Sequence, residues 1–146
     1  MKKATLVIAI IICSLPAVFA QTSKYTKTMQ MYLEVKNALV TDNSKVAASA
    51  AKQLSESITR QDNAGAKVSN LAATIAGTND ISAQRKTFVQ LSKLLVDNIG
   101  EYIGNEPVYI DYCPMKKAYW ISEVKEIKNP YYGASMLTCG KITETK

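Results

Sequence analysis

The stretch ISAQRKTFVQLSKLLVDNIG, residues 81–100, decides the fold because its apolar residues follow the helical repeat without interruption. They recur every three or four positions and make one stripe: Ile81, Phe88, Leu91, Leu95 and Ile99. Leu94 lies beside this stripe, and Gly100 is suited to the position that closes the C-terminal end of a helix. The pattern predicts an amphipathic helix over residues 81–99 that buries one face against its neighbours.

The same repeat occurs three more times upstream of this helix. Three segments carry it: residues 25–40, residues 45–60 with an alanine-rich face, and the shorter residues 67–76. Polar breaks that contain helix-capping residues or glycine separate them: residues 41–44, 61–66 and 77–80. Short connections are typical of antiparallel helices. We therefore expect a mainly α protein, an antiparallel bundle of three to four helices.

The sequence changes character after Gly100, where the helical repeat stops and tyrosine becomes frequent. Residues 108–112 have the composition of a strand, and residues 140–143 are a second, shorter candidate. The sequence NPYYG at residues 129–133 is expected to form a turn. We predict an irregular, aromatic-rich C-terminal cap with short β segments over about residues 101–146.

The N-terminus has the layout of a secretory signal peptide. Lys2 and Lys3 precede an apolar run at residues 6–15, and small residues at Val18 and Ala20 stand where a signal peptidase reads. The run is shorter than a membrane span requires. We predict a signal peptide at residues 1–20, cleavage after Ala20, and a periplasmic domain at residues 21–146 with no membrane span.

Composition argues against several classes of function. The chain contains no histidine, which removes the commonest general base and the commonest metal ligand. Its net charge is +6, but the lysines are spread along the chain, and export argues against nucleic acid as a partner. The acidic residues of the C-terminal part form no recognisable catalytic pair: Glu106, Asp111, Glu123 and Glu126. We expect a protein that is not an enzyme.

Sulfur is the chemistry that remains. Removal of the signal peptide leaves two cysteines, in the strings CPM (113–115) and MLTC (136–139). Cys113 and Met115 point to the same side of an extended segment, and the spacing of Met136 and Cys139 suits one turn. If the two strings meet, four sulfur atoms face one point. Thiolate and thioether ligands together select Cu(I), and the face of Trp120 can lie against a cation.

A structural disulfide is the alternative interpretation. Two cysteines in an exported protein commonly pair, and a Cys113–Cys139 bond would close a long loop and contribute about 3 kcal/mol. Met115 and Met136 would then fill gaps in the core, and Trp120 would be a core aromatic. Under this interpretation the protein is an interaction or scaffold domain without a metal.

The strings CPM, YWISE and KEIKNPYYGASMLTCG, together with YLEVKNALVTDNSKVAASAAKQL in the helical part, resemble a bacterial periplasmic domain of unknown function. That domain is also found fused to adaptor subunits of copper and silver efflux pumps. The resemblance covers about residues 29–142. The similar positions in its C-terminal part are Cys113, Pro114, Met115, Trp120, Asn129, Pro130, Gly133, Met136, Leu137, Cys139 and Gly140. It implies a role in handling Cu(I) or Ag(I), with an adaptor or efflux-pump component as partner.

Overall fold

The computed structural model describes residues 25–58 and 63–146. Within these residues the chain first forms four α-helices: α1 (Lys27–Val40), α2 (Ser44–Ser57), α3 (Asn63–Ala76) and α4 (Ile81–Asp97). A short 3-10 helix, η1 (Ile99–Glu101), leads into the C-terminal part: β1 (Tyr109–Cys113), β2 (Ala118–Ser122), the 3-10 helix η2 (Gly133–Met136) and β3 (Lys141–Thr145). The signal peptide expected at residues 1–20 lies outside the described residues.

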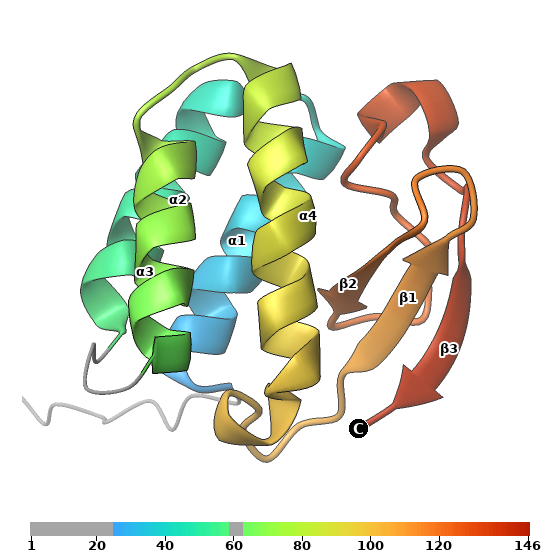
Figure 1. Ribbon diagram of the computed structural model, residues 1–146. Coiled ribbons are helices and arrows are strands. Elements are labelled where there is room, and N and C mark those ends of the chain that lie inside the picture. The colour runs from blue at the N-terminus through green and yellow to red at the C-terminus, as the bar shows by residue number, and fades with distance from the viewer. Residues whose placement is uncertain (1–24, 59–62) are drawn as a thin grey trace, which may run out of the picture.

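The helices pack in chain order, and the sheet packs beside α4 (Figure 1). Helix α1 contacts α2, α2 contacts α3, α3 contacts α4, and α4 contacts β2. Buried residues from the helices and from the sheet belong to one hydrophobic core. The prediction of a mainly α bundle with a small β cap is confirmed. In the described part of the chain no helix has the length and apolar character needed to cross a membrane.

Polar side chains at the breaks explain where the helices begin. The Thr26 hydroxyl accepts the backbone N–H of Met29 at the start of α1. Asn43 does the same for Val46 in α2, and Asp80 accepts two backbone N–H groups in α4. These acceptors satisfy donors that a helix leaves unpaired in its first turn.

Two elements differ from the sequence prediction. Helix α3 begins at Asn63, not at residue 67, and includes Gly65, which is buried. Packing against α2 therefore overrides the poor helix propensity of glycine. Strand β2 was not predicted at all. It forms because every residue from Ala118 to Ser122 pairs with a residue of β1.

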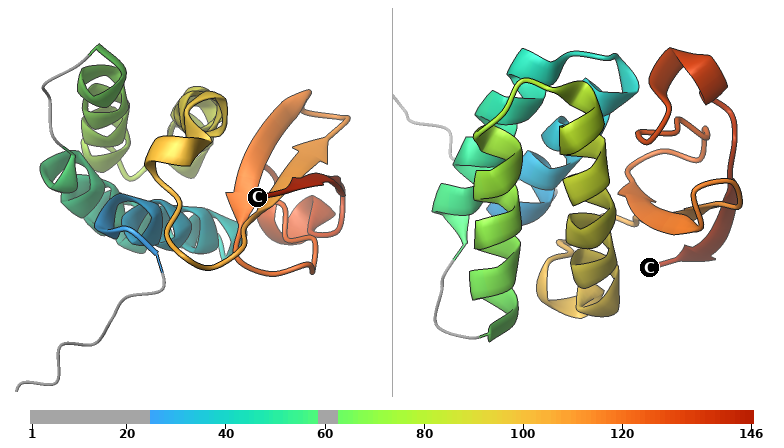
Figure 2. Two further views of the ribbon diagram at one scale, coloured as in Figure 1. Left: turned by 90° about the horizontal axis from the view of Figure 1, so that it is seen from below. Right: turned by 45° about the horizontal axis from the view of Figure 1, so that its top comes forward.

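Helix α1 is buried over more of its circumference than a single stripe would require. Met29 and Leu39 are fully buried, but Met31, Leu33 and Val40 are buried as well. Figure 2 shows the reason, since α1 has helices along one side and the C-terminal cap near another. This placement also buries the side chain of Lys36, whose ammonium must then find a partner in the cap.

The three strands form an antiparallel sheet in the order β2-β1-β3. Strand β2 lies at the edge nearest the helices, and tyrosine hydroxyls form hydrogen bonds with two of its backbone groups. The Tyr32 hydroxyl accepts the Ile121 N–H over 3.0 Å, and the Tyr131 hydroxyl donates to the Tyr119 carbonyl. Tyr32 also shares a 2.8 Å hydrogen bond with Ser92 of α4. The sheet edge is thereby joined to both α1 and α4.

An arginine fastens the loop after β2 to the helices. The Arg85 guanidinium of α4 donates to Asp42 Oδ1 over 2.6 Å and to the Pro130 carbonyl over 2.9 Å. Gly133 lies directly on this pair and has a positive φ of 55°. A Cβ atom there would lie 2.4 Å from Arg85 Nη2 and 2.7 Å from Asp42 Oδ1. We call Asp42, Arg85 and Gly133 the loop latch.

Substituting Gly133 by alanine is expected to lower the free energy of unfolding by about 3 kcal/mol. The left-handed conformation costs an alanine about 1–2 kcal/mol, and moving Arg85 weakens hydrogen bonds worth about 1 kcal/mol each. Urea unfolding followed by circular dichroism measures the change. Gly100→Ala is the matched control, because no atom lies within 4 Å of a Cβ at that position. Equal stabilities of the two variants would contradict the latch.

Candidate metal centre

Two cysteines that are 26 positions apart in the sequence meet at one end of the sheet. Cys113 is the last residue of β1, and Cys139 lies shortly before β3. Their Sγ atoms are 3.6 Å apart. Cys113 is buried, whereas Cys139 is partly exposed. The pair therefore has one anchored thiol and one that is accessible from solvent.

A tight turn positions Cys113. Residues 114–117 connect β1 to β2, and Cys113 pairs with Ala118 across the hairpin. Lys117 adopts a positive φ of 54°, which helps to reverse the chain within a few residues. The backbone N–H of Lys116 donates to Cys113 Sγ over 3.4 Å. The turn thus fixes the sulfur atom as well as the backbone.

Asn129 positions Cys139. Its buried side chain donates from Nδ2 to the Cys139 carbonyl over 2.6 Å and accepts the Tyr131 N–H over 2.8 Å. Its own backbone N–H donates to the Leu137 carbonyl over 2.8 Å. The turn predicted at residues 129–133 includes Asn129 but implies no further role for it. The Asn-Pro pair was the available signal, because asparagine side chains commonly bond nearby backbone groups in turns.

The two methionines occupy the turns that carry the cysteines. Met115 lies in the β1–β2 turn, and its side chain is 65% exposed. Met136 is half-buried, and its carbonyl accepts the Cys139 N–H over 3.1 Å. The structure thus brings the cysteines together and holds one methionine in the chain segment beside each of them. An unbranched thioether on an exposed turn can change rotamer at little cost, so Met115 is free to approach a bound ion.

Trp120 lies directly beneath the residue that follows Cys139. Its side chain is fully buried, and a Cβ placed on Gly140 would lie 2.6 Å from the Trp120 ring. The indole N–H donates to Ser122 Oγ over 3.1 Å, and the edge of the Tyr131 ring packs against it at 5.9 Å between centroids. Trp120 therefore forms the floor under this chain segment.

Contact with Cys113 affects the pKa of the Cys139 thiol. The Cys113 thiol beside it raises the pKa of the Cys139 thiol, because the two sulfur atoms share a hydrogen bond, and partial burial acts in the same direction. At neutral pH the Cys139 thiol therefore keeps its proton. A metal ion that binds as a thiolate complex must displace it, and its affinity must fall as the pH is lowered.

The geometry of the pair suits a bridging ion. Two sulfur atoms that bind one Zn(II) ion at about 2.3 Å, with a tetrahedral angle between them, lie about 3.8 Å apart. The observed 3.6 Å between Cys113 Sγ and Cys139 Sγ is close to this value. Among the residues that the structure describes, no three side chains of His, Cys, Asp or Glu gather where they could share an ion. Met115 and Met136 are the other sulfur-containing residues in the strings that carry this pair.

The acidic residues take structural positions. The Glu123 carboxylate lies 2.7 Å from the Lys36 ammonium and accepts from the Asn37 side chain over 2.9 Å. Both carboxylate oxygens of Asp111 are buried, and within the described residues neither has a hydrogen-bond partner. Burial raises the pKa of Asp111 to about 6, although Ser122 and Lys36 favour its ionised form. The charged side chains of Asp111 and Lys36 indicate exposed positions, so the sequence does not predict this burial.

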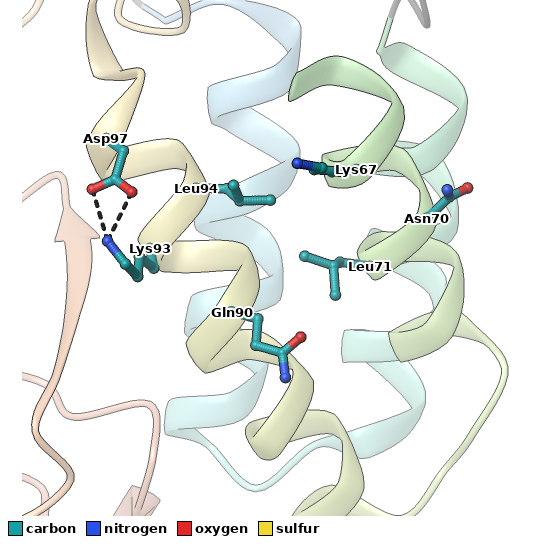
Figure 3. Close-up of a pocket in the computed structure, with 7 residues that line it drawn as sticks. All are labelled: Lys67, Asn70, Leu71, Gln90, Lys93, Leu94 and Asp97. Carbon is teal, nitrogen blue, oxygen red and sulfur yellow. Dashed lines mark hydrogen bonds and ion pairs between the residues drawn. The ribbon is translucent and has the colours of Figure 1, made fainter. Parts of the chain in front are cut away.

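A separate groove lies between α3 and α4, away from the sheet. Its volume is about 460 Å³, and Figure 3 shows Leu71 and Leu94 facing one another across it. At its rim the Lys93 ammonium pairs with Asp97 over 2.8 Å. The groove contains no thiol or thioether, so its chemistry is distinct from that of the cysteine pair.

Comparison with known proteins identifies the helical part. A family model described as "Protein of unknown function (DUF3347)" matches residues 28–103, which is just over half of the 146-residue chain. The match covers nearly all of the four helices and ends before β1. No curated protein and no solved structure matches the chain. The thiol pair lies beyond the matched residues.

Proposed function

We propose that this protein, which belongs to the family described as protein of unknown function (DUF3347), binds one soft monovalent ion, Cu(I) or Ag(I), between Cys113 and Cys139. The observation that carries the proposal is the 3.6 Å separation of the two Sγ atoms. They come from distant parts of the sequence, and separate hydrogen bonds hold the turns that bear them.

The chemistry of the nearby donors favours a soft ion. Thiolates and thioethers bind Cu(I) in preference to the harder Mg(II) and Ca(II). Zn(II) sites are usually completed by histidine or by further cysteines, and the chain has no histidine. Met115 and Met136 are the remaining sulfur donors beside the pair, and they would complete the coordination of a soft ion.

The proposed role is capture and hand-off in the periplasm, without catalysis. The partly exposed Cys139 and the exposed Met115 would receive the ion and release it, while the buried Cys113 anchors it. Thioether ligands exchange more readily than a full set of thiolates, which suits transfer to another protein. An adaptor or efflux-pump component is the proposed recipient, as the resemblance of the sequence implies.

The same proximity also supports a second candidate. The two sulfurs need to approach by about 1.5 Å to reach the bond length of a disulfide, about 2.05 Å. In that case the bond would tie the β1–β2 hairpin to the segment before β3, and the protein would be an interaction domain without a metal. The two candidates make different predictions for the methionines, which have no role in a disulfide.

Replacing Met115 or Met136 by leucine is expected to weaken Cu(I) binding roughly tenfold each, which corresponds to about 1.4 kcal/mol. Leucine keeps the apolar volume, so the free energy of unfolding should change by less than about 1.5 kcal/mol. Affinity is measured by anaerobic competition with a chromogenic Cu(I) chelator. Met29→Leu is the control, because Met29 is fully buried in α1 and belongs to the helical core.

The disulfide candidate predicts the opposite pattern. The methionine variants would then have no Cu(I) affinity to lose, and Cys→Ser variants of unreduced protein would chiefly lower the melting temperature. Unchanged Cu(I) affinity in both methionine variants would contradict thioether ligation.

A further inference from the structure

The lysines beside the thiols and two carboxylates of the cap lie toward opposite ends of the sheet. The segments that hold the sulfurs, residues 113–119 and 136–141, contain three lysines and no acidic residue. Lys116 and Lys117 follow Met115 in the turn, and Lys141 pairs with Tyr112, next to Cys113. The carboxylates of Glu123 and Glu144 lie toward the other end of the strands, where Ser122 and Thr145 pair with Tyr109.

These three lysines are available to a partner. Each is exposed, and within the described part of the chain none of them forms an ion pair, whereas the pairs found elsewhere use other lysines and Arg85. Apolar side chains are exposed among them, Met115 at 65% and Leu137 at 37%. We call Met115, Lys116, Lys117, Leu137 and Lys141 the thiol rim.

The thiol rim adjoins a hollow that a partner side chain can enter. A groove of about 410 Å³ lies beside Leu137, between the C-terminal end of α1 and the cap. Its walls include Val40 from α1, and Lys128, which pairs with Glu126, lies at its edge. The surface beside the thiols therefore combines positive charge, exposed apolar groups and a concave edge.

We propose that the thiol rim docks an acidic protein surface that carries the next ligand for the soft ion. This inference rests on the proposed function and names the chemistry of the recipient. Unpaired lysines around a transfer site attract carboxylates and orient the encounter, while exposed apolar groups make the close contact. An acidic recipient would bring its own sulfur ligand to Cys139 and Met115, the exposed side of the pair.

The test uses reduced full-length protein and two synthetic peptides, one of alternating glutamate and methionine and one of alternating lysine and methionine. The metal-free protein is expected to bind the acidic peptide at least about tenfold more tightly, and the difference should shrink with added salt because the Debye length falls. Changing Lys116, Lys117 and Lys141 together to glutamate should abolish the preference. In the control variant the exposed helix residues Lys45, Lys52 and Lys86 are changed to glutamate, and the preference for the acidic peptide should remain.

The same variants then report on ion transfer. The rim variant, loaded with one equivalent of Ag(I), should release it to the acidic peptide at least about tenfold more slowly than the unaltered protein loaded in the same way. The inference is overturned if the protein binds both peptides equally, or if the helix control loses the preference for the acidic peptide as fully as the rim variant does. The inference is also overturned if binding to vesicles that contain phosphatidylglycerol depends more strongly on the three rim lysines than binding to the acidic peptide does. A protein that holds no Ag(I) but still prefers the acidic peptide refutes the proposed function and not the docking surface.

Discussion

Replacing Asp111 by asparagine is expected to raise the free energy of unfolding at pH 7 by about 3 kcal/mol. Burial raises the pKa of this carboxyl from 3.8 to about 6. In the unfolded chain the group ionises near its ordinary pKa, so holding the ionised form in the native state costs about 1.4 kcal/mol for each pKa unit. Asparagine keeps the shape of the side chain and removes this cost.

The pH dependence of the effect has a definite sign. Below about pH 3.8 Asp111 is protonated in both states, and its ionisation does not affect stability. Between about pH 4 and pH 6 the native state binds more protons, so the stability contributed by this group falls as the pH rises. The difference between Asp111→Asn and the unaltered protein should therefore be small near pH 3.5 and should reach its full value above about pH 6.

Urea unfolding over this range of pH checks the prediction. Glu123→Gln is the informative control, because it leaves the buried Lys36 ammonium without its carboxylate partner and should destabilise the protein by about 3–5 kcal/mol. A stability difference for Asp111→Asn that is independent of pH would show that burial does not raise the pKa of this carboxyl.

Replacing both Cys113 and Cys139 by serine is expected to lower the affinity for Ag(I) or Cu(I) by roughly 10⁴-fold or more. Four-ligand structural zinc sites provide about 10–16 kcal/mol of binding, so two lost thiolates correspond to about 5–8 kcal/mol if the soft site is comparable. The two single variants should lose different amounts of this affinity. Cys113→Ser removes the anchored sulfur, whereas Cys139→Ser leaves the anchor beside Met115.

Isothermal titration with Ag(I) under anaerobic, reducing conditions measures these affinities, with a competing chelator for the unaltered protein. Thermal unfolding of the metal-free variants provides the control, because serine at the buried Cys113 can alter packing. If the double variant kept its affinity while remaining folded, the ion would lie elsewhere in the molecule, and the thiol pair would not be the metal centre.

The helical part of the fold followed from the sequence because its determinants are local. The apolar residues over 81–99 show the helical repeat within the segment itself, and the side chain of the adjacent Asp80 caps the helix. The start of α3 was misplaced because a glycine was interpreted as a break, while packing against α2 holds Gly65 in the helix. Local patterns do not contain the tertiary contacts that decide such cases.

The site was predictable in its residue types but not in its geometry. Thiol and thioether spacing singled out Cys113 and Cys139, and the structure brings these two together. Asn129 holds Cys139 from 10 positions away, and the loop latch joins α4 to Asp42 and to Pro130 across more than 40 positions. No periodicity in the sequence reports such distant contacts, and the buried charges of Lys36 and Asp111 contradict the usual pattern of burial.

The most direct test of the central claim is native mass spectrometry of the reduced protein, prepared without oxygen, with one equivalent of Cu(I) or Ag(I), followed by thiol titration of the same sample. We expect one bound ion per chain and protection of both Cys113 and Cys139 from alkylation. A chain that retains no ion while both thiols react, or that retains one while both thiols stay reactive, would contradict an ion held between these two sulfurs.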